Sequence, residues 1–286
     1  NFGGDSSYVF NLNGAGMVNN EANCIGIGST LEGLGNYPAV YDFLFEQPWH
    51  AQDKINMETW IAAYATRRAG RPDPAVLDAY KNLGNSDHGY SQFFITTPFG
   101  LHDYMRESLT PRHTPCEDAL VVALDKMLQA DPACRKNDGY RFDVVNLTRV
   151  CLSYAAERVA VKMWQAVAAG DLAAYQRESK RLLEIGRDQD TILATRHEWL
   201  LGRWIAEARA WGVTPEEKDY YETCARQVNT TWCGEYLKRE WSGLLTTYYL
   251  ARWEEFLQSI QKSGVVKSLA DCKLDKLAWS PEMFPL

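Results

Sequence analysis

The sequence predicts a mainly α-helical fold, with strand candidates only near its beginning. Apolar residues recur at helical spacing almost throughout the chain from about residue 37. Both strand candidates, residues 8–10 and 24–27, lie in a glycine- and asparagine-rich stretch, residues 1–36. The connections between the predicted helices are short, which favours antiparallel packing in a bundle.

The first two helices of the predicted bundle carry start and stop signals. Asn56 is a good N-cap, and Gly70 can end the helix that it starts. Between them, apolar residues follow a period of about 3.6, at Trp60, Ile61, Tyr64 and Ala65. Asp73 followed by Pro74 opens a second helix that stops at Gly84.

Residues 85–112 form a long connection without a helical period. They are rich in aromatic side chains and contain His88 and His102. Connections of this length without secondary structure of their own are uncommon in compact domains. We therefore expect a functional loop or one that packs on the surface.

Two capping boxes, each with proline at the first helical position, mark later helices. Residues 114–117 (TPCE) predict a helix through about 129, and residues 214–217 (TPEE) predict one through 228. Periodic segments predict the remaining helices, over 140–169, over 191–211, and over 235–262 before Gly264. Gly170 and Asp171 separate the first of these from a further helix that contains Tyr175, Leu182 and Ile185.

Composition excludes several classes of protein. The chain has 286 residues, 46% of them hydrophobic, which is enough for a sizeable core. A net charge of −7 without a basic cluster predicts that nucleic acid is not a partner. No apolar run approaches the roughly 20 residues that cross a bilayer, so no integral membrane segment is expected.

The cysteines and glycines indicate no metal or organic cofactor. Seven cysteines without a CxxC pair cannot form a complete disulfide framework, although one or two bridges stay open, and most are expected to be buried thiols. His113 and Cys116 have ligand-like spacing but lack a second pair, which favours a structural role. The glycines at 26 and 28 begin a dinucleotide fingerprint, but Leu31 occupies the third glycine position.

Glu32 is the leading catalytic candidate. It lies in residues 26–33 (GIGSTLEG), between two glycine-rich turns and just after a strand candidate. Barrel enzymes present catalytic groups to their pockets at such strand-to-helix turns. The alternative is that Glu32 is a helix N-terminal residue that interacts with unpaired N–H groups.

The aromatic residues indicate carbohydrate binding. The chain has ten tryptophans and fifteen tyrosines, several near helix ends. Sugar rings stack their apolar faces on aromatic side chains, while carboxylates bind their hydroxyls. Trp232, Glu235 and Tyr236 therefore form a candidate sugar-binding cluster. The alternative for Trp232 is a half-buried aromatic at a helix end.

An ordered set of segments resembles one known family. The set comprises residues 1–4, 32–33 with 40–41, 141–149, 200–204, 241–244, 248–249 and 252–253. Together they are similar to the C-terminal portion of family 89 glycoside hydrolases, the α-N-acetylglucosaminidases. The resemblance runs in the same order from residue 1 to about residue 257.

The resemblance implies the domain organisation. In that family a (β/α)8 barrel is followed by an all-helical domain that closes one side of the active site. Residues 1–52 would then be the last segment of the catalytic barrel, and residues 53–286 the all-α C-terminal domain. The expected partner of this chain is the remainder of the barrel, upstream of Asn1.

The resemblance also implies a chemistry. Glu32 matches the nucleophile of a retaining exo-α-glycosidase that removes terminal α-linked N-acetylglucosamine from glycans. Tyr41, Trp232 and Tyr236 match positions that line the sugar pocket, and Glu235 would bind hydroxyls beside them. A retaining enzyme needs a second carboxylic acid about 5–5.5 Å from the nucleophile. In this family that acid lies on an earlier barrel strand, so it is expected outside this chain, and no cofactor is implied.

Three departures from the family pattern lie near the expected pocket, at residues 29–31, 34–36 and 233–234. They keep open a related α-glycosidase with a different sugar specificity. A non-catalytic helical carbohydrate-binding protein is the alternative from another class.

Enzymes of this family act outside the cytoplasm of bacteria or in the lysosome of animals. The resemblance therefore predicts a secreted or periplasmic bacterial protein, or alternatively a lysosomal one. The sequons at Asn146 and Asn229 fall in helical contexts, which disfavours glycosylation.

Overall fold

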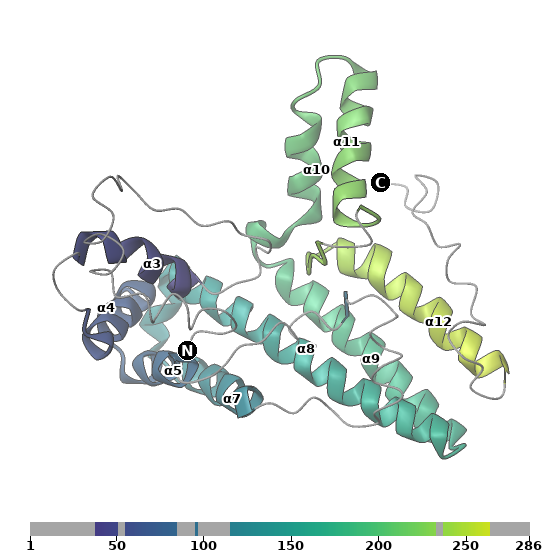
Figure 1. Ribbon diagram of the computed structural model, residues 1–286, viewed down its shortest axis with the longest axis horizontal. Helices are drawn as coiled ribbons and strands as arrows, with labels where there is room; N and C mark the ends of the chain where they lie inside the picture. Colours follow the sequence, from purple (N-terminus) through teal and green to yellow (C-terminus); the bar gives the residue numbers. More distant parts are fainter. Residues whose placement is uncertain (1–37, 51–54, 85–94, 97–114, 233–236, 264–286) are drawn as a thin grey trace, which may run out of the picture. The chain divides into compact units, whose positions relative to one another are not determined.

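A computed structural model of the chain describes residues 38–50, 55–84, 95–96, 115–232 and 237–263. Within these ranges the secondary structure is helical, and the only β-type pairing is an isolated bridge between Leu200 and Ser242. The mainly α prediction is therefore confirmed there (Figure 1). The strand candidates at 8–10 and 24–27 lie outside the described residues.

The chain divides into two compact units, and the division falls within helix α8, Asp138–Ala168. Unit 1 holds residues 1–90 and 113–151, and unit 2 holds residues 91–112 and 152–286. The predicted domain boundary after residue 52 falls in a stretch that the structure does not describe. None of the described helices is both long and apolar enough to cross a membrane.

Unit 1 contains α3 (Pro38–Glu46), α4 (Met57–Ala69), α5 (Pro74–Gly84), α7 (Pro115–Leu128) and the start of α8. Short 3-10 helices cover Gln47–His50 and Pro132–Lys136. The Asn56 side chain accepts a hydrogen bond from the Thr59 N–H, and Gly70 ends α4 with a φ of 75°. Asp73 accepts in the same way from Val76 at the start of α5. Both predicted helices are confirmed, with their caps.

An aromatic cluster forms the core between the first helices of unit 1. Trp60 and Tyr64 of α4 stack with their centroids 5.1 Å apart. Phe43 of α3 meets Trp60 edge-on at 5.0 Å, and Tyr80 of α5 meets Tyr64 edge-on at 5.1 Å. Such pairs contribute about 0.5–1.5 kcal/mol each beyond the burial of their area. The cluster therefore fixes α3 and α5 on α4.

Unit 2 contains the rest of α8, then α9 (Leu172–Leu193), α10 (Leu201–Arg209), α11 (Pro215–Asn229) and α12 (Leu250–Ser263). A 3-10 helix covers His197–Trp199, and a π-helix covers Leu245–Tyr249. In its core, Phe256 of α12 meets Trp164 of α8 edge-on at 5.9 Å. Trp253 donates to the Ile95 carbonyl at 3.0 Å, which attaches Ile95 to the same core.

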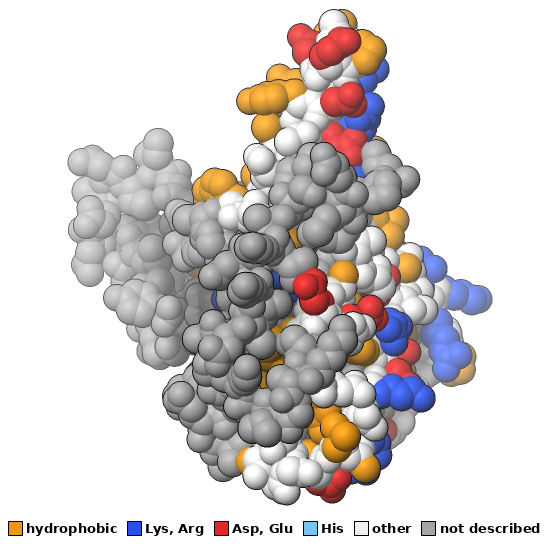
Figure 2. All heavy atoms as spheres, turned by 90° about the vertical axis from the view of Figure 1, so that its right-hand side faces the viewer, with side chains coloured by type: hydrophobic (Ala, Val, Ile, Leu, Met, Phe, Trp, Pro, Cys, Tyr) orange, Lys and Arg blue, Asp and Glu red, His pale blue; other side chains and the backbone are white. Residues whose placement is uncertain are grey.

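Helices α10 and α11 form an antiparallel hairpin (Figure 1). The predicted capping box at its turn is confirmed: Thr214 and Glu217 bond reciprocally to each other's backbone. Hydrogen bonds from the N–H groups of Val213 and Thr214 hold the pKa of the Glu217 carboxyl below its ordinary value. Figure 2 shows hydrophobic and acidic side chains exposed together on this hairpin.

The predicted helix over 191–211 is wrong. Helix α9 ends at Leu193 and α10 begins at Leu201. Between them the backbone leaves the helix to pair with Ser242, whose carbonyl accepts from the Leu201 N–H at 3.0 Å. This pairing joins residues far apart in sequence, and such tertiary contacts override local helix propensity.

The predicted helix over 235–262 begins too early. Residues 237–243 are not helical: Lys238 has a φ of 42° and Gly243 a φ of 87°. Helical structure starts with the π-helix and continues into α12. The reason is that Ser242 pairs with another part of the chain: its N–H donates to the Trp199 carbonyl at 2.8 Å, and its carbonyl accepts from the Leu201 N–H at 3.0 Å. In the same stretch Glu240 is only 4% exposed, and its side chain bonds to Ser153 and Gln189.

Candidate functional site

The structure describes two of the five predicted site residues. Tyr41 lies half-buried in α3, in unit 1. Trp232 follows α11 in unit 2 and is 51% exposed. Glu32, Glu235 and Tyr236 lie outside the described residues. The catalytic and sugar-binding roles of all five therefore stay predictions, and the structure shows how the segments beside them are held.

Helix α3, which begins six residues after Glu32, packs firmly into unit 1. Its residues Ala39 and Phe43 are 1% and 4% exposed. Near its other end, the Trp60 indole N–H donates to the Glu46 carboxylate at 2.5 Å. Contacts near both ends fix α3 within unit 1.

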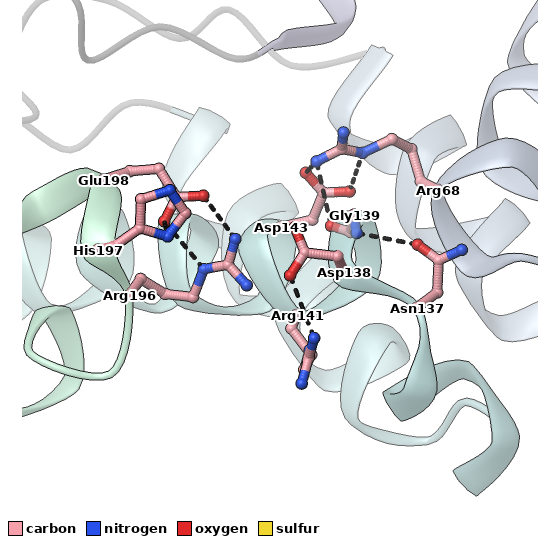
Figure 3. Close-up of polar contacts among 9 residues, drawn as sticks. All are labelled: Arg68, Asn137, Asp138, Gly139, Arg141, Asp143, Arg196, His197 and Glu198. Atoms are coloured by element: carbon pink, nitrogen blue, oxygen red, sulfur yellow. Dashed lines mark hydrogen bonds and ion pairs between the residues drawn. The ribbon is translucent and has the colours of Figure 1, made fainter.

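A buried ion pair lies in the same unit. Arg68 of α4 donates two hydrogen bonds of 2.7 Å to Asp143 of α8, and it also binds the Gly139 carbonyl (Figure 3). The Tyr80 hydroxyl donates to Asp143 as well, at 2.5 Å. Burial, the largest influence, raises the pKa of the Asp143 carboxyl, while Arg68 and Tyr80 oppose that shift. The cluster joins α4, α5 and α8.

A cavity of about 10 Å³ separates the start of α3 from this ion pair, a volume suited to about one water molecule. It is lined by Pro38, Ala39, Tyr64, Tyr80, Leu83, Met127, Asp143 and Leu147. Within the described part of the chain, the buried Tyr64 hydroxyl has no hydrogen-bond partner. Burial raises the pKa of Tyr64 above its ordinary value. The structure thus places one satisfied and one unsatisfied tyrosine hydroxyl in the same cluster.

These two tyrosines should respond oppositely to loss of the hydroxyl. Tyr64→Phe removes an unsatisfied buried group and should leave unfolding free energy unchanged or raise it by up to about 1 kcal/mol. Tyr80→Phe removes a hydrogen bond to a buried carboxylate and should lower it by about 1.5–3 kcal/mol. Urea unfolding of the two variants checks this, and equal losses would contradict the assigned bonding.

In unit 2, the end of α11 fixes the backbone of Trp232, whose N–H donates to the Gln227 carbonyl at 2.9 Å. Helix α11 is tied to α10 there, because the Trp204 indole donates to the Ala225 carbonyl at 3.2 Å. The Trp204 ring also lies 5.6 Å from that of Trp241. An exposed ring on a fixed backbone can stack on a ligand at low entropic cost.

Arg196 and Glu198 form an ion pair at the break between α9 and α10 (Figure 3). The side chain of Arg196 is 9% exposed and that of Glu198 is 27% exposed. The pKa of the Glu198 carboxyl lies below its ordinary value; burial raises it, but bonds from Arg196 and a backbone N–H prevail. This pair stabilises the break that sequence periodicity did not predict.

Sequence reasoning missed three hydrogen-bonded carboxylates: Asp143 and Glu240, which are buried, and Asp190, which is half-buried. Each receives hydrogen bonds from side chains more than 50 positions away in the sequence. Local sequence patterns do not indicate partners this far away in the sequence. Gly243 was the one available signal, because a glycine within a predicted helix suggests a break.

Other sequence predictions concern metals, thiols and glycosylation. Among the described residues, no group of three His, Cys, Asp or Glu side chains is placed to hold a metal ion. Cys134 is a buried free thiol, whereas the free thiols of Cys151 and Cys224 are half-buried, so burial of most cysteines is not confirmed among these three. The sequon asparagines Asn146 and Asn229 are 3% and 2% exposed, and such burial disfavours glycosylation.

Comparison with known proteins gives a consistent set of relatives. The family model for the α-N-acetylglucosaminidase (NAGLU) C-terminal domain matches residues 60–284. Human α-N-acetylglucosaminidase is 26% identical over 261 residues, which cover 84% of this chain and 33% of that protein.

Solved structures of family 89 glycoside hydrolase from Clostridium perfringens share the fold. The complex with PUGNAc has a TM-score of 0.78 and 24% identity, covering 98% of this chain and 35% of that one. A variant of that enzyme has two glutamates replaced by glutamine and was solved in complex with its substrate GlcNAc-α-1,4-galactose. It has a TM-score of 0.75 and 23% identity, covering 98% of this chain and 34% of that one. The chain thus spans about a third of the length of the relatives that it matches.

Proposed function

The chain belongs to the family of α-N-acetylglucosaminidase C-terminal domains, and we propose that it is the C-terminal portion of a retaining exo-α-glycosidase. The substrate would be terminal α-linked N-acetylglucosamine on glycans. The observation that carries the proposal is the family match over residues 60–284. The human relative is named for this activity, and the Clostridium enzyme was captured with a GlcNAc-α-linked substrate.

The proposed mechanism uses two carboxyl groups. Glu32 attacks the anomeric carbon and forms a glycosyl ester, while an acid protonates the departing glycosidic oxygen. Water then attacks the anomeric carbon, assisted by the same group acting as base, and releases Glu32. We place this acid/base upstream of residue 1, on the remainder of the barrel. The two glutamates replaced in the Clostridium complex agree with such a pair.

The proposed pocket combines one aromatic stack with polar contacts. Trp232 would stack on the apolar face of the sugar, and its 51% exposure leaves ring surface for that contact. Glu235 and Tyr236 would bind hydroxyls, and Tyr41 would orient the Glu32 carboxylate. No metal or organic cofactor takes part. For location, we propose a secreted or periplasmic bacterial enzyme that acts on glycans outside the cytoplasm.

A second candidate keeps the mechanism and changes the sugar. It is favoured by the departures from the family pattern at residues 29–31, 34–36 and 233–234, all close in sequence to predicted pocket residues. A change in pocket shape near the sugar's 2-position would alter the preference for the acetamido group while leaving Glu32 in place.

A hydrolysis screen of the full-length protein on aryl α-glycosides tests the proposal. A site that binds the 2-acetamido group should favour the α-N-acetylglucosaminide over the α-glucoside by about 100-fold or more in kcat/KM. Preference for another α-glycoside would support the second candidate. Absence of hydrolysis across the series would instead support a non-catalytic carbohydrate-binding protein.

Removal of the proposed stacking ring should weaken sugar binding. Trp232→Ala should raise KM by about two- to tenfold, because an aromatic contact contributes about 0.5–1.5 kcal/mol. Trp211→Ala is the matched control, since that ring is 79% exposed at the far end of the α10–α11 hairpin. If Trp232→Ala lowers only the melting temperature and leaves the kinetics unchanged, Trp232 has a structural role.

A further inference from the structure

The segment between α11 and α12 is held by one turn of α9. We call residues 237–249 the connecting segment. Its backbone is in the left-handed region at Lys238, whose φ is 42°, and at Gly243, whose φ is 87°. A non-glycine residue in the left-handed region persists only where surrounding contacts fix it. The Thr96 hydroxyl donates to the Lys238 carbonyl at 3.4 Å.

Glu240 provides the first attachment of the connecting segment. Its side chain accepts hydrogen bonds from the Ser153 hydroxyl at 2.7 Å and from the Gln189 amide at 2.8 Å. Ser153 and Gln189 are fully buried, and Glu240 is 4% exposed. Buried bonds to a carboxylate are short and directional, so they fix the backbone that carries it.

Asp190, the neighbour of Gln189, provides the second attachment. One carboxylate oxygen accepts from the Gly243 N–H at 2.8 Å and from the Thr246 N–H at 3.3 Å. The other accepts from the Ser242 hydroxyl at 3.1 Å. Asp190 thereby caps the start of the π-helix, as an N-cap residue does for an α-helix. Irregular helical turns of this kind are frequent at functional sites.

Described contacts connect this attachment to Trp232. Trp241 precedes Ser242, and its ring lies 5.6 Å from that of Trp204. The Trp204 indole binds the last turn of α11 through the Ala225 carbonyl. That turn also accepts the Trp232 N–H through Gln227. A shift of the connecting segment therefore displaces the support of the exposed Trp232 ring.

We propose that Asp190 is a positioning residue for sugar binding, which acts through the Trp241–Trp204 contact on Trp232. Glu240 fixes the same segment through Ser153 and Gln189. The proposal rests on the proposed function, because it requires Trp232 to contact the sugar. Neither carboxylate touches the substrate.

Kinetics of the full-length enzyme on an aryl α-N-acetylglucosaminide test this role. Asp190→Ala removes all of the Asp190 side-chain bonds and should raise KM by about two- to tenfold, no more than Trp232→Ala does, with kcat within about twofold of wild type. Asp190→Asn keeps an oxygen that accepts from Gly243 and Thr246, so its KM should stay near wild type. Tyr175→Phe is the matched control: it loses a buried bond between α9 and α12, to the Leu257 carbonyl, without touching the connecting segment. It should lower thermal stability and leave KM unchanged.

A double-mutant cycle separates positioning from general destabilisation. If Asp190 acts through Trp232, then Asp190→Ala should cause no further rise of KM in the Trp232→Ala background. Additive effects on KM, or an unchanged KM in Asp190→Ala while Trp232→Ala raises it, would overturn the positioning role alone. An unchanged KM in Trp232→Ala would overturn both this role and the proposed stacking contact.

Discussion

Replacement of Glu32 by glutamine in the full-length enzyme should lower kcat by about 10³- to 10⁶-fold. Glutamine has nearly the same shape, but its amide cannot form the glycosyl ester that a retaining mechanism requires. Folding stability should change little, since the substitution preserves volume. Steady-state hydrolysis of an aryl α-N-acetylglucosaminide measures the effect, with the melting temperature recorded in parallel.

Asp42→Asn is the matched control for Glu32→Gln. Asp42 is an exposed carboxylate ten residues further along the chain, and its nearest cation, Arg67, lies 4.0 Å away. Its replacement should leave kcat within about twofold of wild type, because this side chain is exposed and has no proposed contact with the sugar or with Glu32. Turnover near wild type in Glu32→Gln would contradict the nucleophile assignment.

Removal of the Arg68 side chain should have the largest effect on stability. Arg68→Met leaves the Asp143 carboxylate buried, with the Tyr80 hydroxyl as the remaining donor of this cluster. Breaking one side of a buried ion pair costs about 3–5 kcal/mol of unfolding free energy. The neighbouring Arg67→Met is the control, because the Arg67–Asp42 pair is more than half exposed and contributes at most about 1 kcal/mol.

The pH dependence of Arg68→Met provides a second check. Burial already raises the pKa of Asp143, and loss of Arg68 removes the main opposing interaction. A carboxyl whose pKa is raised in the folded state stabilises the fold below its unfolded pKa, and this contribution is lost as pH rises through the folded pKa. The loss of unfolding free energy in Arg68→Met, relative to wild type, should therefore become smaller as the pH falls from about 7 to about 5. A loss that grows on acidification would contradict the ion pair between Arg68 and Asp143.

Local signals predicted the helix boundaries that local bonds determine. Asn56, Asp73 and Thr214 each cap the helix that the sequence assigns to them. The two wrong boundaries depend on distant contacts instead. Pairing with Ser242 ends the helical run near Leu200, and the same pairing keeps the chain around Ser242 from starting the last helix early.

The same distinction between local signals and distant contacts applies to the candidate site. The resemblance of an ordered set of segments was enough to identify the family, and with it the matches of candidate residues such as Glu32 and Trp232. The supports of the site were not predictable in this way. Glu240 meets Ser153 across 87 positions, and Asp143 meets Arg68 across 75. No periodicity or spacing rule connects residues that far apart.

Glu32 is proposed as the nucleophile of a retaining glycosidase, and labelling of the covalent intermediate tests this role most directly. The intermediate of the full-length enzyme can be trapped with an activated fluorinated N-acetylglucosaminyl fluoride, and the label located by peptide mass spectrometry. Such reagents form the glycosyl ester readily but hydrolyse it slowly, so the label marks the attacking carboxylate. We expect one added sugar on the peptide that contains Glu32, and none on that peptide from Glu32→Gln. A label on any other carboxylate, or turnover that inverts the anomeric configuration without labelling, would contradict the role of Glu32.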